Sequence, residues 1–189
     1  MDTINKIKSI SIWIFIIPFV AINTCLILIT NFHELFPNKA HIIGFTIPYI
    51  DGGASISRTA RVFPTYLIFK PAMFLTAVLL YIYWKNNNQL INNLNSTNIN
   101  HKFKTFGILS AVFLVIHSIL LGVKFDIQIY KLFRRVVLLL FIIFELIAQG
   151  YLVFHFYKLK TKLEKMINKK VLIIKFLLVS ILVITAILS

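Results

Sequence analysis

Residues 10–30 read ISIWIFIIPFVAINTCLILIT and contain no charged side chain. A helix needs about 20 mostly apolar residues to cross the hydrocarbon core of a bilayer, which is about 30 Å thick. This stretch is therefore long enough to span a membrane, and Trp13 near its start is a residue type that anchors helices at the interface. We expect Pro18 to kink the helix or to be accommodated by neighbouring helices.

Similar apolar blocks recur along the chain. They cover residues 64–84, 105–123, 132–157 and 171–189. The chain has 189 residues, of which 59% are hydrophobic and only 14% charged, whereas a soluble domain of this size needs a more polar surface. The sequence predicts an all-α protein: a polytopic transmembrane helical bundle with about five spanning helices. All of it, residues 1–189, forms one domain with a long outer loop over residues 31–63.

The N-terminal block differs from a cleaved signal peptide. Lys6 and Lys8 precede it, but the apolar run is longer than a signal core and lacks a small-x-small cleavage site, so we predict an uncleaved anchor helix. Cys25 is the only cysteine, which excludes an internal disulfide and a cysteine-based metal cluster. No ligand spacing predicts a metal ion or another cofactor.

The chain is strongly basic, with 20 Lys and Arg residues against 6 Asp and Glu residues. The lysines lie mainly between the apolar blocks, where they face lipid headgroups and determine topology. Nucleic acid is not expected as a partner, because no soluble module is present to bind it. Loops on the N-terminal side are the more basic set, above all residues 158–170. We therefore predict a cytoplasmic N-terminus, with the loop 31–63 on the non-cytoplasmic side.

Glu145 falls near the middle of the fourth predicted helix. An acidic residue at that depth costs roughly 2.5–3.5 kcal/mol on insertion scales, so we expect it to face other helices and to be held neutral. Gln149 lies one turn further on, and Arg134 precedes both on the same face. This polar stripe is interpreted as polar contact between helices, with a proton- or headgroup-binding site as the alternative.

Other polar residues fall inside the apolar blocks. His117 in the third helix could reach Glu145 if these helices pack as antiparallel neighbours, which would suit a proton relay or half a metal site. A single buried imidazole is the simpler interpretation. Lys70 and Lys175 lie inside their helices, and their long side chains can reach the interfaces.

The segment 48–61, PYIDGGASISRTAR, places a dense polar set beside a membrane helix. Asp51, Arg58 and Arg61 are candidate ligands for a lipid headgroup, because two arginines can hold a phosphate bidentately. Alternatively, one arginine pairs with Asp51 in an interfacial loop. No Gly-x-Ser-x-Gly sequence surrounds the serines, so serine hydrolysis is not supported, and no catalytic residue is assigned.

This segment resembles the damage-regulated autophagy modulator (DRAM) family, whose wider group includes a GPI-anchor lipid remodelling factor. The likeness consists of Pro48 to Gly52 in the outer loop, followed by a second helix ending in Tyr81, Tyr83 and Trp84. It covers roughly the first half of the chain. Family members usually have one more residue between the Ile and the Asp, and six helices. The resemblance implies a lipid-related or trafficking role without a general catalytic centre.

Three hypotheses follow. The first is a non-enzymatic, lipid-associated multi-pass membrane protein whose partners are membrane lipids. The second is an accessory subunit of a larger complex with other membrane subunits. The third is a small transporter or membrane enzyme that uses Glu145 with His117, although no repeat symmetry of the kind found in transporters is present.

Overall fold

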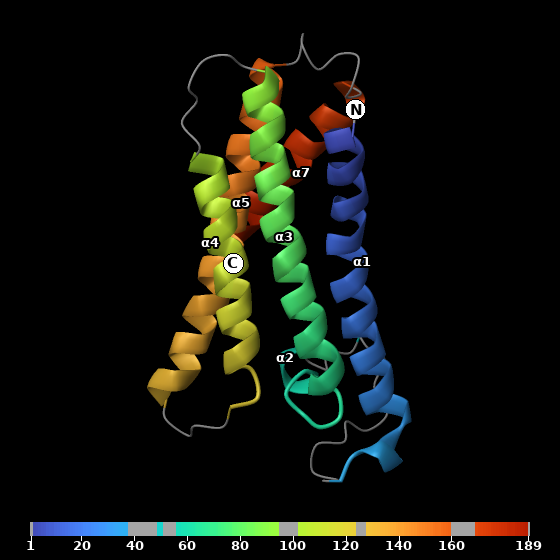
Figure 1. Cartoon of the computed structure of the whole chain (residues 1–189). Coiled ribbons are helices and arrows are strands. Elements are labelled where there is room, and N and C mark those ends of the chain that lie inside the picture. Colours follow the sequence, from blue (N-terminus) through green and yellow to red (C-terminus); the bar gives the residue numbers. More distant parts are fainter. Residues whose placement is uncertain are drawn as a thin grey trace.

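The computed structural model describes residues 2–37, 49–50, 56–94, 102–123, 128–159 and 169–188, and every regular element in these ranges is a helix (Figure 1). The predicted all-α helical bundle is therefore confirmed. The elements are α1 (Asp2–Asn31), η1 (His33–Leu35), α2 (Ile56–Thr59), α3 (Tyr66–Leu94), α4 (Lys102–Leu120), α5 (Gln128–Lys158) and α7 (Lys169–Leu188).

The helix α3 is central to the bundle. It packs against α1 on one side and α4 on the other, while α4 and α5 form an antiparallel pair (Figure 1). The end at which α1 begins and α3 ends is called the upper end, as in Figure 1, and the opposite end is the lower end. The helix α7 starts at the upper end, runs obliquely toward the middle and packs against α5.

Four of these helices, α1, α3, α4 and α5, are long and apolar enough to cross a membrane. The chain is thus an integral membrane protein by the length and composition of its helices. Four of the five predicted spans meet this criterion. The fifth predicted span corresponds to α7.

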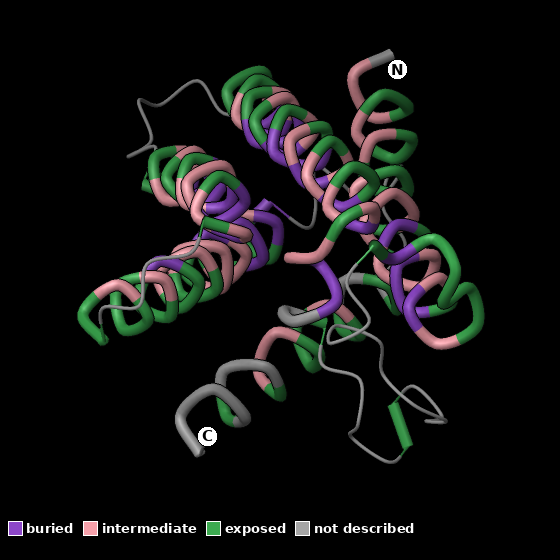
Figure 2. Tube along the Cα trace, turned by 90° about the horizontal axis from the view of Figure 1, so that it is seen from below, coloured by how far each residue is buried: buried purple, intermediate pink, exposed green. Residues whose placement is uncertain are grey.

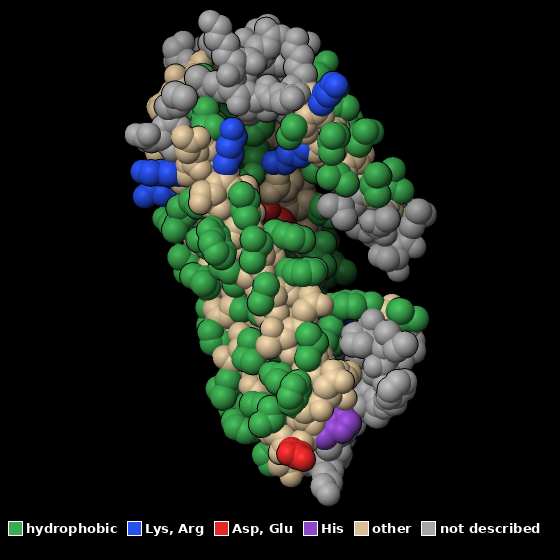
Figure 3. All heavy atoms as spheres, turned by 90° about the vertical axis from the view of Figure 1, so that its right-hand side faces the viewer, with side chains coloured by type: hydrophobic (Ala, Val, Ile, Leu, Met, Phe, Trp, Pro, Cys, Tyr) green, Lys and Arg blue, Asp and Glu red, His purple; other side chains and the backbone are tan. Residues whose placement is uncertain are grey.

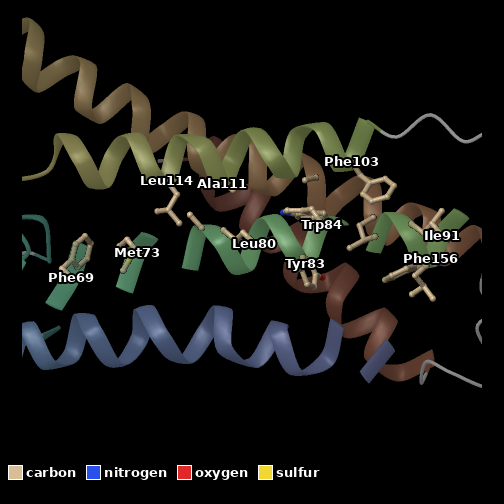
Figure 4. Close-up of a cluster of buried hydrophobic side chains, with 14 of the residues drawn as sticks. Phe69, Met73, Leu80, Tyr83, Trp84, Ile91, Phe103, Ala111, Leu114 and Phe156 are labelled. Atoms are coloured by element: carbon tan, nitrogen blue, oxygen red, sulfur yellow. The ribbon is translucent and has the colours of Figure 1, made fainter. Parts of the chain in front are cut away.

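Apolar residues of α3 recur at helical spacing along its buried face. Phe69, Met73, Leu80 and Trp84 belong to one hydrophobic core with residues of α4 and α5 (Figure 4). The buried positions face the interior of the bundle in Figure 2, and the outer faces carry exposed apolar side chains such as Val78. A lipid solvent explains this pattern, because apolar residues are then stable on both sides of a helix.

The predicted end of the second helix, at residue 84, is wrong. The structure continues α3 to Leu94 through a run of asparagines whose polarity favours a solvated loop. Leu90 and Ile91 are buried in the main core, and Asn87 donates a hydrogen bond to Tyr83 O at 2.8 Å. Apolar contacts on one face thus outweigh the weak helix preference of asparagine.

The other predicted helix boundaries differ by a few residues. The largest of these differences is at the start of α1, which begins at Asp2 instead of residue 10. The predicted outer loop contains η1 and the short helix α2. Thr65 holds the end of this loop in place. Its hydroxyl lies within hydrogen-bonding distance of Thr59 O and Val62 O (2.7 Å) and shares its one proton between them, and the carbonyl of Thr65 accepts from Cys25 Sγ at 3.4 Å.

Candidate intramembrane polar site

Glu145 of α5 lies at a junction of three helices. Its Oε2 accepts hydrogen bonds from Trp84 Nε1 of α3 (3.3 Å) and Ser110 Oγ of α4 (2.6 Å). Its Oε1 accepts from Gln149 Nε2, one turn further along α5, at 2.9 Å. Both carboxyl oxygens are thus engaged, and one side chain joins α3, α4 and α5 through polar contacts.

A missing side chain allows this junction to form. A Cβ atom at Gly107 would stand 2.2 Å from Trp84 Cδ2, so only glycine permits the indole to lie against the backbone of α4. Ala111 follows at i+4 on the same buried face. Small residues at this spacing let membrane helices approach closely. The close approach places Trp84 Nε1 within reach of Glu145, and Trp84 itself is fully buried.

Ser110 can serve the carboxyl group in either protonation state. Its Oγ lies 2.6 Å from Glu145 Oε2 and 2.8 Å from Gly107 O, but a hydroxyl has only one proton to donate. If Glu145 is ionised, Ser110 donates to the carboxylate. If Glu145 is neutral, its own proton is donated to Ser110 Oγ and the serine donates to Gly107 O. The site therefore tolerates protonation without rearrangement.

A lysine approaches this junction from α7. Lys175 Nζ donates a hydrogen bond to Tyr83 OH at 3.3 Å, and its charge acts on Glu145. Tyr83 precedes Trp84 on α3, and the two rings meet edge to face with centroids 5.2 Å apart. In Figure 4 the two side chains point to different sides of α3, Trp84 toward α4 and Tyr83 toward α7. Lys175 is half-buried and has no ion pair within the described part of the chain.

Three amide oxygens near this junction lack hydrogen-bond donors among the described residues. They are Asn88 Oδ1, Gln149 Oε1 and Asn87 Oδ1, and Asn87 is fully buried. The orientation of Gln149 and Asn87 follows from their other contacts: each amide nitrogen faces an acceptor, Glu145 Oε1 or Tyr83 O, so each oxygen points elsewhere. Because α3 and α5 run in the same direction, both amides lie about one turn above Trp84 and Glu145.

The molecule is hollowed beside this region. Figure 3 shows the face on which α1 lies, and acidic side-chain atoms are visible in a hollow in its upper half, beneath Lys or Arg side chains. The upper half of α1 packs less closely on this side, since its described residues there are at most partly buried. The lower half packs more closely, with four buried residues: Ala21, Cys25, Leu26 and Ile29. Glu145 is accordingly only partly enclosed, despite its three hydrogen bonds.

His117 does not join this site. The helices α4 and α5 do pack as antiparallel neighbours, but His117 lies about two turns below Ser110 and faces the backbone of Arg134. No hydrogen bond joins it to Glu145 within the described residues, and its Nδ1 has no partner there. Arg134 likewise stays with His117, so the predicted stripe separates into an upper part, Glu145 with Gln149, and a lower part.

Lys70 is remote from the site as well. It lies near the lower end of α3, about 20 Å along the helix from Trp84 at 1.5 Å per residue. Its Nζ stands over the Tyr66 ring, 5.8 Å from the centroid.

The predicted headgroup ligands of the outer loop lie mostly outside the described residues. This applies to Asp51 and to the side chain of Arg58, whereas Arg61 is described and partly buried. Of the segment that resembles the DRAM family, Tyr49 and Ile50 are described, and Tyr49 OH donates to Asn23 Oδ1 of α1 at 3.3 Å. No group of three metal-ligating side chains occurs among the residues that the structure places.

Several residues of the site were not identified from the sequence. Tyr83 and Trp84 were predicted only as the aromatic end of the second helix, and Asn87 was placed beyond that end. Ser110 and Gly107 were not predicted as site residues. The spacing of Gly107 and Ala111 was the available clue to a close helix contact.

No family model matches the sequence, and neither a curated protein nor a solved structure is significantly similar to it.

Proposed function

We propose that this chain is a non-enzymatic multi-pass membrane protein that binds a lipid headgroup beside Glu145 and Lys175. The acyl chains of the lipid would lie along the exposed apolar faces of the helices. Resemblance to the DRAM family supports the same lipid-related role.

The observation that carries this proposal is the position of Lys175. Its ammonium group lies within an apolar helix, and the neutral hydroxyl of Tyr83 is its hydrogen-bond partner. A cation in a membrane interior is costly unless an anion or a polar group compensates it. Glu145 is near enough to act on it electrostatically, but the two groups form no ion pair within the described residues. A phosphate of a lipid would supply the missing anion.

The contacts of Glu145 favour binding over catalysis. Both of its oxygens already accept hydrogen bonds from protein donors, which hold the carboxyl group in one orientation. A general base needs an oxygen directed at the proton that it removes. A fixed carboxyl group at the edge of a hollow instead suits a complementary ligand.

The proposal includes the topology. The basic residues of the upper end, among them Lys158 and Lys170, would lie in the cytoplasm, with the outer loop on the opposite side. The headgroup site would then belong to the cytoplasmic half of the bilayer. Single cysteines introduced at Lys6 and at Glu34 in a Cys25→Ser background test this topology with a thiol reagent that does not cross membranes. Glu34→Cys should react in intact cells, whereas Lys6→Cys should react only after the membrane is opened. The reverse pattern would contradict the topology.

Lipid retention tests the binding site. The protein would be purified in mild detergent and its bound phospholipid measured by native mass spectrometry. We expect about one tightly held phospholipid per chain, and a loss of about tenfold in occupancy in Lys175→Met, since one charged contact is removed. Lys85→Met is the matched control. Lys85 directly follows Tyr83 and Trp84 in the sequence, but its side chain is exposed.

Two outcomes would reject the proposal. One is a wild-type protein that retains no phospholipid. The other is equal occupancy in the two lysine variants. If the chain elutes only with a second protein in fixed proportion, the alternative of an accessory subunit replaces it.

A further inference from the structure

We propose that the site selects a phospholipid whose headgroup carries a primary ammonium as well as a phosphate, as in an ethanolamine phospholipid. This inference rests on the proposed lipid-binding function and adds the chemical class of the ligand.

The site presents a donor on one side and acceptors on the other. Lys175 supplies the donor: an ammonium group has three N–H bonds, and Tyr83 OH accepts one of them. The acceptors are Gln149 Oε1, which has no donor within the described part of the chain, and the carboxyl group of Glu145, to which the amide of Gln149 is bonded. Buried polar atoms without a partner are rare in proteins, and each one here calls for a donor.

A phosphate alone would satisfy only the donor side. An ionised Glu145 would repel it, and Gln149 Oε1 would still lack a donor. A headgroup that ends in a primary ammonium removes both difficulties. Its phosphate pairs with Lys175, and its N–H groups can bond to Gln149 Oε1 and pair with Glu145.

The same argument separates the common headgroups. A choline headgroup has the same net charge, but its quaternary nitrogen carries no N–H and leaves Gln149 Oε1 unpaired. A glycerol headgroup offers hydroxyl donors but no positive charge for Glu145. Lys175 and Glu145 belong to neighbouring helices and form no ion pair with each other within the described residues. An ethanolamine phosphate fits between them because one short headgroup carries both a negative and a positive charge.

The inference is tested by competition among lipids. Detergent-purified protein would be exchanged into nanodiscs made from equal parts of phosphatidylethanolamine, phosphatidylcholine and phosphatidylglycerol with identical acyl chains. Native mass spectrometry after mild activation then reports which lipid stays bound. We expect ethanolamine lipid to be enriched about tenfold over each of the others, the effect of roughly one charged hydrogen bond.

The variants assign the preference to residues. Gln149→Met removes one unpaired oxygen and Glu145→Gln removes the negative charge, and both should lower the enrichment toward that of choline lipid while a phospholipid stays bound. Gln89→Met, at an exposed position of α3, should keep the full preference. Thermal denaturation confirms that each variant is folded, and Gln149→Met decides the question if Glu145→Gln unfolds.

The outcomes distinguish the two proposals. If no phospholipid of any class is retained, the proposed function fails and this inference fails with it. If phospholipid is retained without preference for ethanolamine, only the inference is overturned. An undiminished preference in both Gln149→Met and Glu145→Gln would overturn the assigned residues. Retention of soluble phosphoethanolamine in place of lipid would show that the ligand is not a membrane lipid.

Discussion

Glu145 lies near the middle of α5 and His117 lies in the last turn of α4, and the structure treats these two polar residues of neighbouring helices differently. Glu145 accepts hydrogen bonds from α3, α4 and its own helix. His117 faces the backbone of Arg134, and its Nδ1 has no partner among the described residues. The comparison shows that a position between packed helices does not by itself determine the role of a polar residue. What decides it is whether the facing helix carries a small residue and a donor at the same level.

Gly107 should be the most sensitive position on the Glu145 side of this comparison. Gly107→Ala places a methyl group within 2.2 Å of the Trp84 ring, so the indole must move and its hydrogen bond to Glu145 breaks. We expect a loss of about 1–3 kcal/mol in the free energy of unfolding, measured by thermal or chemical denaturation in detergent.

Gly150→Ala is the matched control. A Cβ atom there has no neighbour within 4 Å, so the substitution should be neutral or stabilise α5 by up to about 1 kcal/mol. Equal destabilisation by the two alanines would show that helix flexibility, and not the fit of Trp84, matters at Gly107.

Glu145 itself should give the next largest effect. Glu145→Leu leaves the N–H of Trp84 and the amide of Gln149 without their acceptor, and we expect a cost of about 1–2 kcal/mol. Glu145→Gln keeps an acceptor oxygen and should cost less than about 0.6 kcal/mol, the average of measured polar contacts between membrane helices. A larger loss of stability in Glu145→Gln than in Glu145→Leu would mean that the negative charge, and not the hydrogen bonds, holds the helices together.

The fold was predictable because lipid imposes a simple rule on length and composition. Each apolar block in the sequence became a helix, and Lys85 to Leu94 were missed because their polarity suggested water. Leu90 and Ile91, spaced to continue the buried face of α3, were the residues that decided otherwise.

The site was only half predictable. Glu145 and Gln149 were identified because they share one helix face and therefore depend on spacing alone. Trp84, Ser110 and Lys175 come from three other helices, and their meeting depends on helix register and on the tilt of α7. A single sequence does not contain these relations in any local pattern, so the same reasoning paired Glu145 with His117 instead.

His117 provides the smallest effect and the sharpest contrast. Its Nδ1 contributes no hydrogen bond within the described chain, so His117→Leu removes an unsatisfied polar atom together with the contact of the imidazole with the backbone of Arg134, and it adds apolar surface to the core between α4 and α5. We expect a change within about 0.5 kcal/mol, because the lost contact and the removed unsatisfied nitrogen have opposite effects on stability. Denaturation of His117→Leu beside Glu145→Leu measures the comparison directly. A cost for His117→Leu equal to that for Glu145→Leu would show that the imidazole has an essential partner, and the two residues would then play the same role.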